Sequence, residues 1–225
     1  MSPLNIDDWI SQLFTDPDLA RMGHAQKPDE NDLGLGWIYY GLVRVAKPAR
    51  IVVIGSYRGF VPLVLARALA DNGPDEDGRV AQVVFIDPSM VDDFWVDPTK
   101  VVSYFESHGL NNINHLKKTT QEFVKTKQYQ SLENIGLLFV DGYHSAEQAA
   151  FDYNSFKDKL TDRAYVLFHD SVSVRNSKIY GQAKAYDHTV RHFMDELKTD
   201  PGLQVFDLAH GSGVTLVQKV APGVA

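Results

Sequence analysis

The sequence predicts an α/β protein built on a doubly wound, mostly parallel sheet. Short apolar runs alternate along the chain with longer amphipathic stretches, which is typical of successive strand–helix units. The runs RIVVIG (50–55) and IGLLFV (135–140) show no polar alternation, as expected for strands buried on both faces. Only the turn-rich segment AHGSG (209–213) separates the last two strands, and so short a connection joins antiparallel neighbours. We therefore expect seven strands, with one antiparallel strand near an edge.

The individual elements follow from these patterns in chain order. The second helix is rich in aromatic residues and stops at Lys47-Pro48, because the residue before proline avoids the helical region. Pro62 lies in the first turn of the third helix, where proline is tolerated. Helices are expected over residues 4–21, 35–46, 60–70, 101–108, 145–160 and 184–198. Strands are expected over residues 50–55, 80–86, 112–118, 135–140, 164–168, 203–206 and 213–219, with loops at 70–79 and 171–183.

Composition and charge limit the class of protein. The chain has 225 residues, 44% hydrophobic and 23% charged, which is typical of a globular protein and excludes a wholly disordered or fibrous one. A net charge of −7 without a basic excess argues against nucleic acid as a partner. The lack of cysteine excludes disulfides, a thiolate zinc site and a cysteine nucleophile. No apolar run reaches 18 residues and no positively charged leader is present, so we expect a cytoplasmic protein with no membrane partner.

Two strand ends in the first half carry residues that suggest a ligand, since ligands of open α/β sheets bind beyond the carboxyl ends of the strands. The turn GSYRG (55–59) would let a ligand approach the backbone, and the alternative is a tight turn that binds nothing. This turn matches neither the dinucleotide fingerprint nor a P-loop. Asp87 ends the run VVFI and is placed to accept hydrogen bonds from a ribose diol. Its alternative role is to start a turn with Pro88.

Two later strand ends, VDGYHS (140–145) and FHDS (168–171), each combine an aspartate with a histidine. Because neighbouring strands lie about 4.8 Å apart, Asp141 and Asp170 can share one hard divalent cation if their strands are adjacent. The alternative is that each aspartate caps the backbone of a turn or helix. Their pairing in one chain favours a common site.

These four strand ends together resemble the class I S-adenosylmethionine-dependent methyltransferases, in particular the family 24 group related to catechol O-methyltransferases. The resemblance is carried by VVIGSYRGFVPLVLARAL (52–69), VVFIDPS (83–89), IGLLFVDGYHSAEQAAFDYNSF (135–156) and AYVLFHDS (164–171). It implies a Rossmann-like methyltransferase fold in one compact unit, with residues 1–48 as a helical N-terminal extension and residues 49–225 as the S-adenosylmethionine-binding domain. It also implies methylation of a small-molecule acceptor, with oxygen as the expected site and nitrogen as the alternative.

The resemblance further implies a role for each matching residue. The cofactor would be held by Gly55, Ser56, Gly59, Asp87, Thr120, Gln121 and Asp141, with the glycines at its methionine and ribose part, Asp87 at the ribose and Thr120 and Gln121 near adenine. Asp141 and Asp170 would ligate Mg²⁺ or another divalent cation. His169 would be either a third ligand or a residue that contacts the ligands without binding the ion. His144 or His169 would take the acceptor proton, although His144 has the alternative of capping the next helix.

Two residues depart from the family pattern. Val53 stands where an acid usually precedes the first glycine by two residues, and Tyr143 replaces the second aspartate of D-G-D-H. A nucleotide-cofactor oxidoreductase and a non-catalytic ligand-binding protein of the same fold therefore remain as alternative functions. His188 and His192 have an i, i+4 spacing that zinc can use, but HTVRH lacks the glutamate of H-E-x-x-H, which favours a solvated helix face.

The acceptor pocket is expected to form from the N-terminal helix, the loop 171–183 and the helix after it, the regions that no motif constrains. A homodimer through the aromatic-rich N-terminal part is the expected assembly.

Overall fold

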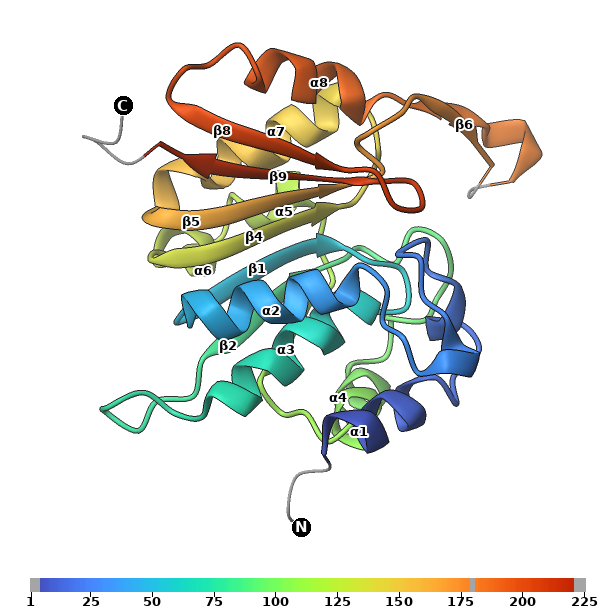
Figure 1. Cartoon of the computed structure of the whole chain (residues 1–225), viewed down its shortest axis with the longest axis vertical. Coiled ribbons are helices and arrows are strands. Elements are labelled where there is room, and N and C mark those ends of the chain that lie inside the picture. The colour runs from blue at the N-terminus through green and yellow to red at the C-terminus, as the bar shows by residue number, and fades with distance from the viewer. Residues whose placement is uncertain (1–4, 179–180, 221–225) are drawn as a thin grey trace.

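The sheet has the topology that the sequence predicts. A computed structural model describes residues 5–178 and 181–220 (Figure 1). The main sheet contains, in spatial order, β3 (Ile113–Leu116), β2 (Gln82–Ile86), β1 (Arg50–Gly55), β4 (Ile135–Asp141), β5 (Leu160–His169), β9 (Val214–Lys219) and β8 (Leu203–Leu208). The strands from β3 to β5 pair in parallel, whereas β9 is antiparallel to both of its neighbours. A seven-stranded sheet with one antiparallel strand near an edge is thus confirmed.

Helices cover both faces of this sheet (Figure 1). One face packs against α1 (Ile6–Leu13), α2 (Gly36–Ala46), α3 (Phe60–Asn72) and α4 (Pro98–Ser107). The other face packs against α5 (Thr120–Phe123), α6 (Lys127–Gln130), α7 (Ala146–Phe156) and α8 (Val190–Leu197). Single turns of 3₁₀ helix lie at Leu19–Arg21, Pro28–Glu30, Lys157–Lys159 and Gln182–Lys184. Among the described residues, no helix has the length and apolar character needed to cross a membrane.

Strand β1 shows why the central runs are apolar throughout. Ile51 and Val53 belong to the core cluster under α2 and α3, while Val52 and Ile54 belong to the cluster under α7 and α8. Because side chains of a strand alternate between faces, a strand covered on both sides needs apolar residues at every position. The two clusters hold the sheet between them and leave its carboxyl edge for the loops.

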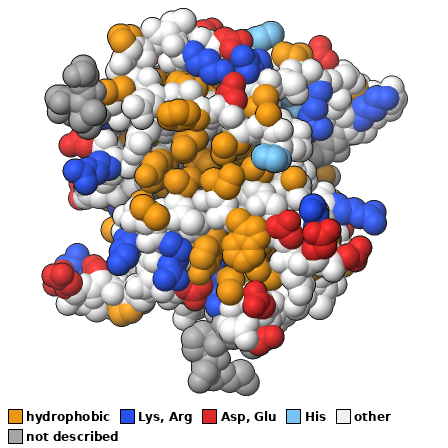
Figure 2. All heavy atoms as spheres, in the orientation of Figure 1, with side chains coloured by type: hydrophobic (Ala, Val, Ile, Leu, Met, Phe, Trp, Pro, Cys, Tyr) orange, Lys and Arg blue, Asp and Glu red, His pale blue; other side chains and the backbone are white. Residues whose placement is uncertain are grey.

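The sheet is not covered everywhere. Figure 2 shows hydrophobic side chains gathered over β5 and β9, on the side of the sheet that α2 and α3 only partly cover. Tyr165 and Leu216 are half-buried there, and Phe206 of the neighbouring β8 is 56% exposed. This apolar face lies apart from the carboxyl edge, where the cavity described below opens.

Three predicted helices are shorter than expected. The first runs only to Leu13 instead of residue 21, since Pro17 disfavours helical backbone at Asp16 and the chain turns there. The helix expected over 145–160 ends at Phe156, where a 3₁₀ turn follows. The last begins at Val190 instead of residue 184. Helices α5 and α6 were not expected, although Thr119 and Glu122 form a capping box whose spacing is visible in the sequence.

The segment before α8 forms a small hairpin in place of the predicted loop and helix start. Strand β6 (Arg175–Ser177) pairs with β7 (Tyr186–His188) in an antiparallel register that joins Arg175 to His188. His188 therefore lies on a strand and is buried, while His192 lies exposed on α8. The expectation that both histidines share one solvated helix face was wrong, because the helix starts two residues after His188.

Candidate active site

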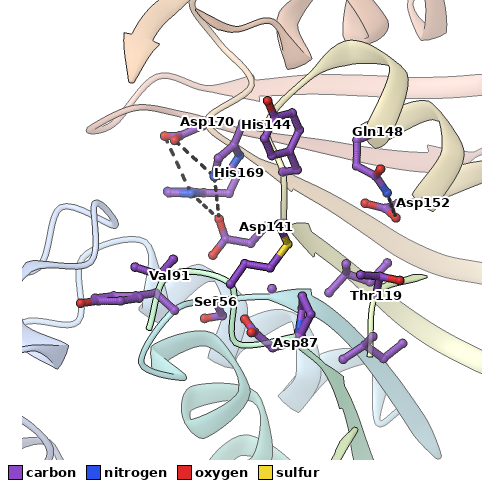
Figure 3. A pocket seen from close by; sticks show the side chains of 18 of the residues that line it. Ser56, Asp87, Val91, Thr119, Asp141, His144, Gln148, Asp152, His169 and Asp170 are labelled. Carbon is purple, nitrogen blue, oxygen red and sulfur yellow. Dashed lines mark hydrogen bonds and ion pairs between the residues drawn. The ribbon is translucent and has the colours of Figure 1, made fainter. Parts of the chain in front are cut away.

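One cavity of about 510 Å³ lies at the carboxyl ends of β1, β2, β4 and β5. Its size is within the range of small-molecule and cofactor sites. Figure 3 shows Asp141, His144, His169 and Asp170 together on one side of the cavity, Thr119, Gln148 and Asp152 on another, and Ser56 and Asp87 below. The four strand ends selected from the sequence thus converge on one cavity.

The turn after β1 requires glycine at its first position. Gly55 has a φ of +76°, and a Cβ atom there would lie 2.1 Å from the carbonyl oxygen of Asp141. The close approach joins the tips of β1 and β4. Gly55 and Ser56 line the cavity, whereas Gly59 begins α3 and faces Trp95, with its would-be Cβ 3.1 Å from the indole.

Asp87 lies at the end of β2 and lines the cavity. Its Oδ1 accepts a hydrogen bond of 2.7 Å from the backbone N–H of Ser89, so the turn-starting role foreseen as an alternative is present as well. Burial raises the pKa of the Asp87 carboxyl to about 6, and the Ser89 hydrogen bond only partly offsets this shift. Additional hydrogen-bond donors stabilise a buried carboxylate, and the two hydroxyl groups of a ribose are donors of this kind.

The ends of β4 and β5 bring their acidic and imidazole groups into contact. His169 Nδ1 lies 2.7 Å from Asp141 Oδ1 and 3.8 Å from Asp170 Oδ1. His144 Nε2 lies 3.8 Å from Asp141 Oδ1 and 3.7 Å from Asp170 Oδ2. Asp141 and Asp170 therefore face a common centre with one histidine on each side.

The pKa values of these two histidines are shifted in opposite directions. Burial alone would lower the pKa of His169, but the charge and hydrogen bond of Asp141, with Asp170 behind, raise it to about 9. Burial lowers the pKa of His144 to about 4, because the two carboxylates attract its proton too weakly to compensate. Near neutral pH, His144 is the imidazole with a free lone pair.

Asp170 is held by the β6–β7 hairpin. His188 Nδ1 lies 2.9 Å from Asp170 Oδ2, and Arg175 forms an ion pair with the same oxygen. Burial opposes the charge of Asp170, but the hydrogen bond with His188 and the charge of His169 hold its pKa well below the usual range. From the sequence, Arg175 is a candidate to meet an anionic acceptor or an ordinary loop charge, and no local signal indicates its ion pair with Asp170 or the contact of His188 with Asp170.

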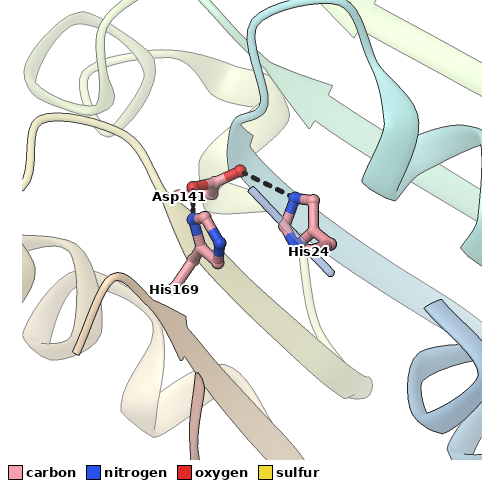
Figure 4. A group of neighbouring side chains, drawn as sticks. All are labelled: His24, Asp141 and His169. Atoms are coloured by element: carbon pink, nitrogen blue, oxygen red, sulfur yellow. Dashed lines mark hydrogen bonds and ion pairs between the residues drawn. The ribbon is translucent and has the colours of Figure 1, made fainter. Parts of the chain in front are cut away.

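A histidine from the N-terminal segment also belongs to this group. His24 is fully buried; its ring lies 4.1 Å from that of His169, and its Nε2 lies 3.9 Å from Asp141 Oδ2 (Figure 4). Tyr39 Oη lies 3.1 Å from its Nδ1. In the sequence, His24 lies between the helices expected over residues 4–21 and 35–46, and only the tertiary fold brings it next to Asp141 and His169.

The far end of the cavity is polar. Thr120 and Gln121 line it as expected, and Gln121 Nε2 donates to Gln148 Oε1 at 2.7 Å. Gln148 Nε2 in turn donates to Asp152 Oδ1 at 2.8 Å. Burial raises the pKa of Asp152 to about 6, and its Oδ2 has no hydrogen-bond partner. Gln148 and Asp152 lie on α7. From the sequence they resemble any pair of polar residues on one side of a helix, so they were not predicted to belong to the site.

The residues present suit both groups that the fold family implies. Gly55 and the buried Asp87 suit an adenosyl cofactor. The backbone at Gly55 can approach the cofactor closely, and the Asp87 carboxylate can accept hydrogen bonds from its ribose hydroxyls. For a cation, two buried atoms near the Asp141 carboxylate, His24 Nε2 and Asp170 Oδ1, have no hydrogen-bond partner. Histidine and aspartate side chains with such free lone pairs are suited to a divalent ion.

The two family departures have clear structural places. Val53 is fully buried in the sheet, where a carboxylate would lack a polar partner. Tyr143 stacks on Tyr186 of the hairpin with ring centroids 4.4 Å apart and an interplanar angle of 8°. Tyr143 therefore joins the β4 end to the hairpin in place of a second acid.

The fold and the cavity define an S-adenosylmethionine-dependent methyltransferase of class I. A family model described as a methyltransferase domain, that of methyltransferase family 24, matches residues 52–171. Because the match spans more than half of the chain, the chain belongs to this family. No curated protein sequence matches it.

Solved structures share the fold at low sequence identity. The O-methyltransferase TomG from Streptomyces achromogenes, involved in tomaymycin synthesis and solved with S-adenosylmethionine, is 16% identical, with a TM-score of 0.63 over 98% of this chain and 92% of that one. The O-methyltransferase from Bacillus cereus, solved with S-adenosylhomocysteine, is 15% identical, with a TM-score of 0.61 over 97% and 93%. PaMTH1 from Podospora anserina, also bound to S-adenosylhomocysteine, is 18% identical, with a TM-score of 0.60 over 96% and 86%.

Proposed function

We propose that this enzyme transfers the methyl group of S-adenosylmethionine to an oxygen atom of a small molecule, with help from a divalent cation. One observation carries the proposal: a glycine turn with a buried acid and a pair of Asp–His strand ends open into the same cavity. S-adenosylmethionine, when bound, supplies a methyl group on a positively charged sulfur, so the protein mainly has to align the acceptor and receive its proton.

The cofactor roles follow the order of residues along the cavity. Gly55 and Ser56 would lie against the methionine part, and Asp87 would accept from the ribose hydroxyls. Thr120 and Gln121 would border adenine at the polar end. Gly59 is the N-cap residue of α3 and would help to shape the turn. Asp141 would stand between the cofactor and the acceptor, since it closes against Gly55 and faces His169.

At the acceptor end, His144 is the better candidate for the base. His144 Nε2 would receive the proton of the acceptor hydroxyl as that oxygen takes the methyl group that S-adenosylmethionine supplies, with S-adenosylhomocysteine as the leaving product. His169 is less suited, because Asp141 and the carbonyl oxygen of Gly23 already occupy its two nitrogens. Asp141 and Asp170 would hold a divalent cation, which when bound lowers the pKa of a nearby hydroxyl.

A small acceptor fits this end of the cavity better than a macromolecule. The cavity lining includes Arg175, Ser177 and Tyr186 of the hairpin, and Arg21 and Met22 of the N-terminal segment. The acceptor would enter between these two elements. A homodimer, a cytoplasmic location and the division into residues 1–48 and 49–225 stay predictions of the sequence.

Ligand-induced stabilisation tests the cofactor assignment. In a thermal-shift experiment, S-adenosylhomocysteine at about 100 times its Kd should stabilise the protein by about 2.7 kcal/mol, because only the folded state binds it. NAD and NADP should give no shift. Stabilisation by NAD(P) instead would favour the oxidoreductase alternative, and no shift with any nucleotide would favour a protein that does not bind this cofactor.

Removal of divalent ions tests the cation. Turnover should fall in the presence of a chelator and return when a divalent ion is added in excess. The reason is that the bound cation would polarise the acceptor oxygen and lower the pKa of its hydroxyl. Binding of S-adenosylhomocysteine should persist in the chelator, which separates the cation from the cofactor. Full turnover in chelator would remove the cation from the mechanism.

The pH dependence of cofactor binding tests Asp87. Because burial raises the pKa of its carboxyl to about 6, the group becomes protonated as the pH falls through 6 and loses acceptor capacity for the ribose. The affinity for S-adenosylhomocysteine should therefore be constant above pH 7 and fall about tenfold by pH 5. Calorimetric titration across this range measures it. The Asp87→Asn variant should bind weakly with a flat profile, and an unchanged slope in that variant would assign the titration to another group.

A further inference from the structure

A histidine that the proposed reaction does not use lies behind the cavity lining, next to Asp141 and His169. His24 is fully buried; its ring stacks on Phe60 with centroids 5.1 Å apart and lies tilted against His169 at 4.1 Å. Its Nε2 has no hydrogen-bond partner and points toward Asp141 (Figure 4). A buried polar atom without a hydrogen-bond partner lowers the stability of the folded state. A bound ligand outside the protein chain would remove this cost at His24 Nε2.

In both His24 and His169, the ring nitrogen farther from Asp141 lies next to an oxygen atom. Tyr39 Oη lies 3.1 Å from His24 Nδ1, and the carbonyl oxygen of Gly23 lies 3.4 Å from His169 Nε2. Histidines that bind metals are oriented in this way, with the far N–H donated to an oxygen and the near nitrogen left as the ligand. The near nitrogens of both rings face the Asp141 carboxylate: His24 Nε2 has no hydrogen-bond partner, whereas His169 Nδ1 makes a 2.7 Å hydrogen bond to Asp141 Oδ1. Binding of an ion would replace the proton of that hydrogen bond, as ligand deprotonation generally accompanies metal binding.

We propose that His24, His169 and Asp141 hold the cation of this enzyme, and that it is a first-row transition-metal ion rather than Mg²⁺. The inference rests on the proposed function and changes its ligand set, because the two histidines replace Asp170, which already pairs with Arg175 and His188. One ligand atom from each of the three residues lies within 4.8 Å of the others. Bonds of about 2.0 to 2.2 Å to a shared ion place ligand atoms about 3 to 3.5 Å apart, so small side-chain shifts suffice.

The donor set decides the class of ion. Two imidazole nitrogens and one carboxylate leave open positions and suit Mn²⁺, Fe²⁺, Co²⁺, Ni²⁺ or Zn²⁺. Mg²⁺ prefers oxygen ligands and keeps several waters, which a fully buried imidazole does not favour. Asp141 and His169 also line the cavity, so an ion between them remains open to the acceptor.

A second group, formed by His144, His169 and Asp170, also satisfies the distance requirement. It competes for the same His169 but lacks an oxygen partner of the kind that Tyr39 provides for His24, and Asp170 Oδ2 is already paired with Arg175. The orphaned His24 nitrogen therefore favours the first group, and the second is an outcome that the experiment can reveal.

A Co²⁺ titration of the metal-free protein, followed by its visible absorption, tests the site. The wild type should bind Co²⁺ with the band intensity of a nitrogen-containing site, and a 1,000-fold excess of Mg²⁺ should not displace it. The His24→Gln variant should bind Co²⁺ about 100-fold more weakly, with S-adenosylhomocysteine affinity kept within about twofold. The matched control His192→Gln changes an exposed histidine on α8 and should bind Co²⁺ as the wild type does.

The inference is overturned if His24→Gln binds Co²⁺ normally, if His144→Gln rather than His24→Gln loses the ion, or if Mg²⁺ displaces Co²⁺ at equal concentration. Should His24→Gln fail to fold, pulsed electron paramagnetic resonance of the Mn²⁺-loaded wild type replaces it, and the absence of coupling to imidazole nitrogen overturns the inference. S-adenosylhomocysteine binding is measured separately by calorimetry. Its failure would remove the proposed methyl transfer, whereas loss of cobalt selectivity alone would remove only the present inference.

Discussion

Replacement of His144 by glutamine should reduce kcat about 10²- to 10⁴-fold, the usual contribution of a positioned general base. The lone pair of His144 Nε2 lies between Asp141 and Asp170 at the acceptor end of the cavity. Glutamine keeps a polar group of similar size but cannot take a proton. His144 lies away from the polar end of the cavity, where Thr120 and Gln121 would border adenine. The Kd for S-adenosylhomocysteine should therefore stay within about twofold of the wild-type value.

Steady-state kinetics and calorimetry on the same preparation separate the two effects. His210→Gln serves as a control, since His210 lies exposed in the turn between β8 and β9. A fall in affinity equal to the fall in kcat would assign His144 to cofactor binding. An unchanged kcat would leave it with the alternative role of supporting the start of α7.

Introduction of a single methyl group at Gly55 should destabilise the whole fold. In the Gly55→Ala variant, the new Cβ would meet the carbonyl oxygen of Asp141 at 2.1 Å while the backbone holds a φ of +76°. The obstacle is backbone of the adjacent strand, so β1 and β4 must separate at their tips. Strain and overpacking together should cost about 2 to 6 kcal/mol of the free energy of unfolding. Urea denaturation measures this loss.

Gly41→Ala provides the matched comparison for Gly55→Ala. Gly41 lies inside α2, and a Cβ atom there would meet nothing within 4 Å. Alanine in a helix interior is favoured over glycine by about 0.5 to 1 kcal/mol, so this variant should be as stable as the wild type or more so. Equal stability of the two variants would mean that the β1 turn adapts, and the close contact would lose its structural importance.

The architecture could be predicted from local patterns because the central strands are buried on both faces. Runs such as 50–55 and 135–140 carry apolar residues at every position, and that pattern depends only on neighbours in the chain. Helix ends were less accurate. The first helix stops at Leu13, because Pro17 and the following turn override the amphipathic pattern.

The candidate site was predicted in part for the same reason. Asp87, Asp141 and Asp170 were found because each follows or ends a recognisable strand, and strand order then brings them to one edge. His188 was misplaced, because its contact with Asp170 depends on a hairpin whose register no local signal indicates. Asp152 was missed, because on a helix it resembles any other polar residue.

By itself, the sequence determined the class of fold, the glycine turn and the acidic strand ends, since these are written in short segments whose geometry follows from backbone sterics and burial. Only the tertiary structure decided which side chains surround those ends. His24 reaches Asp141 from 117 positions away in the chain, and Arg175 reaches Asp170 through a hairpin. Such contacts depend on how separate elements pack, and packing is settled by the whole core rather than by any segment of it.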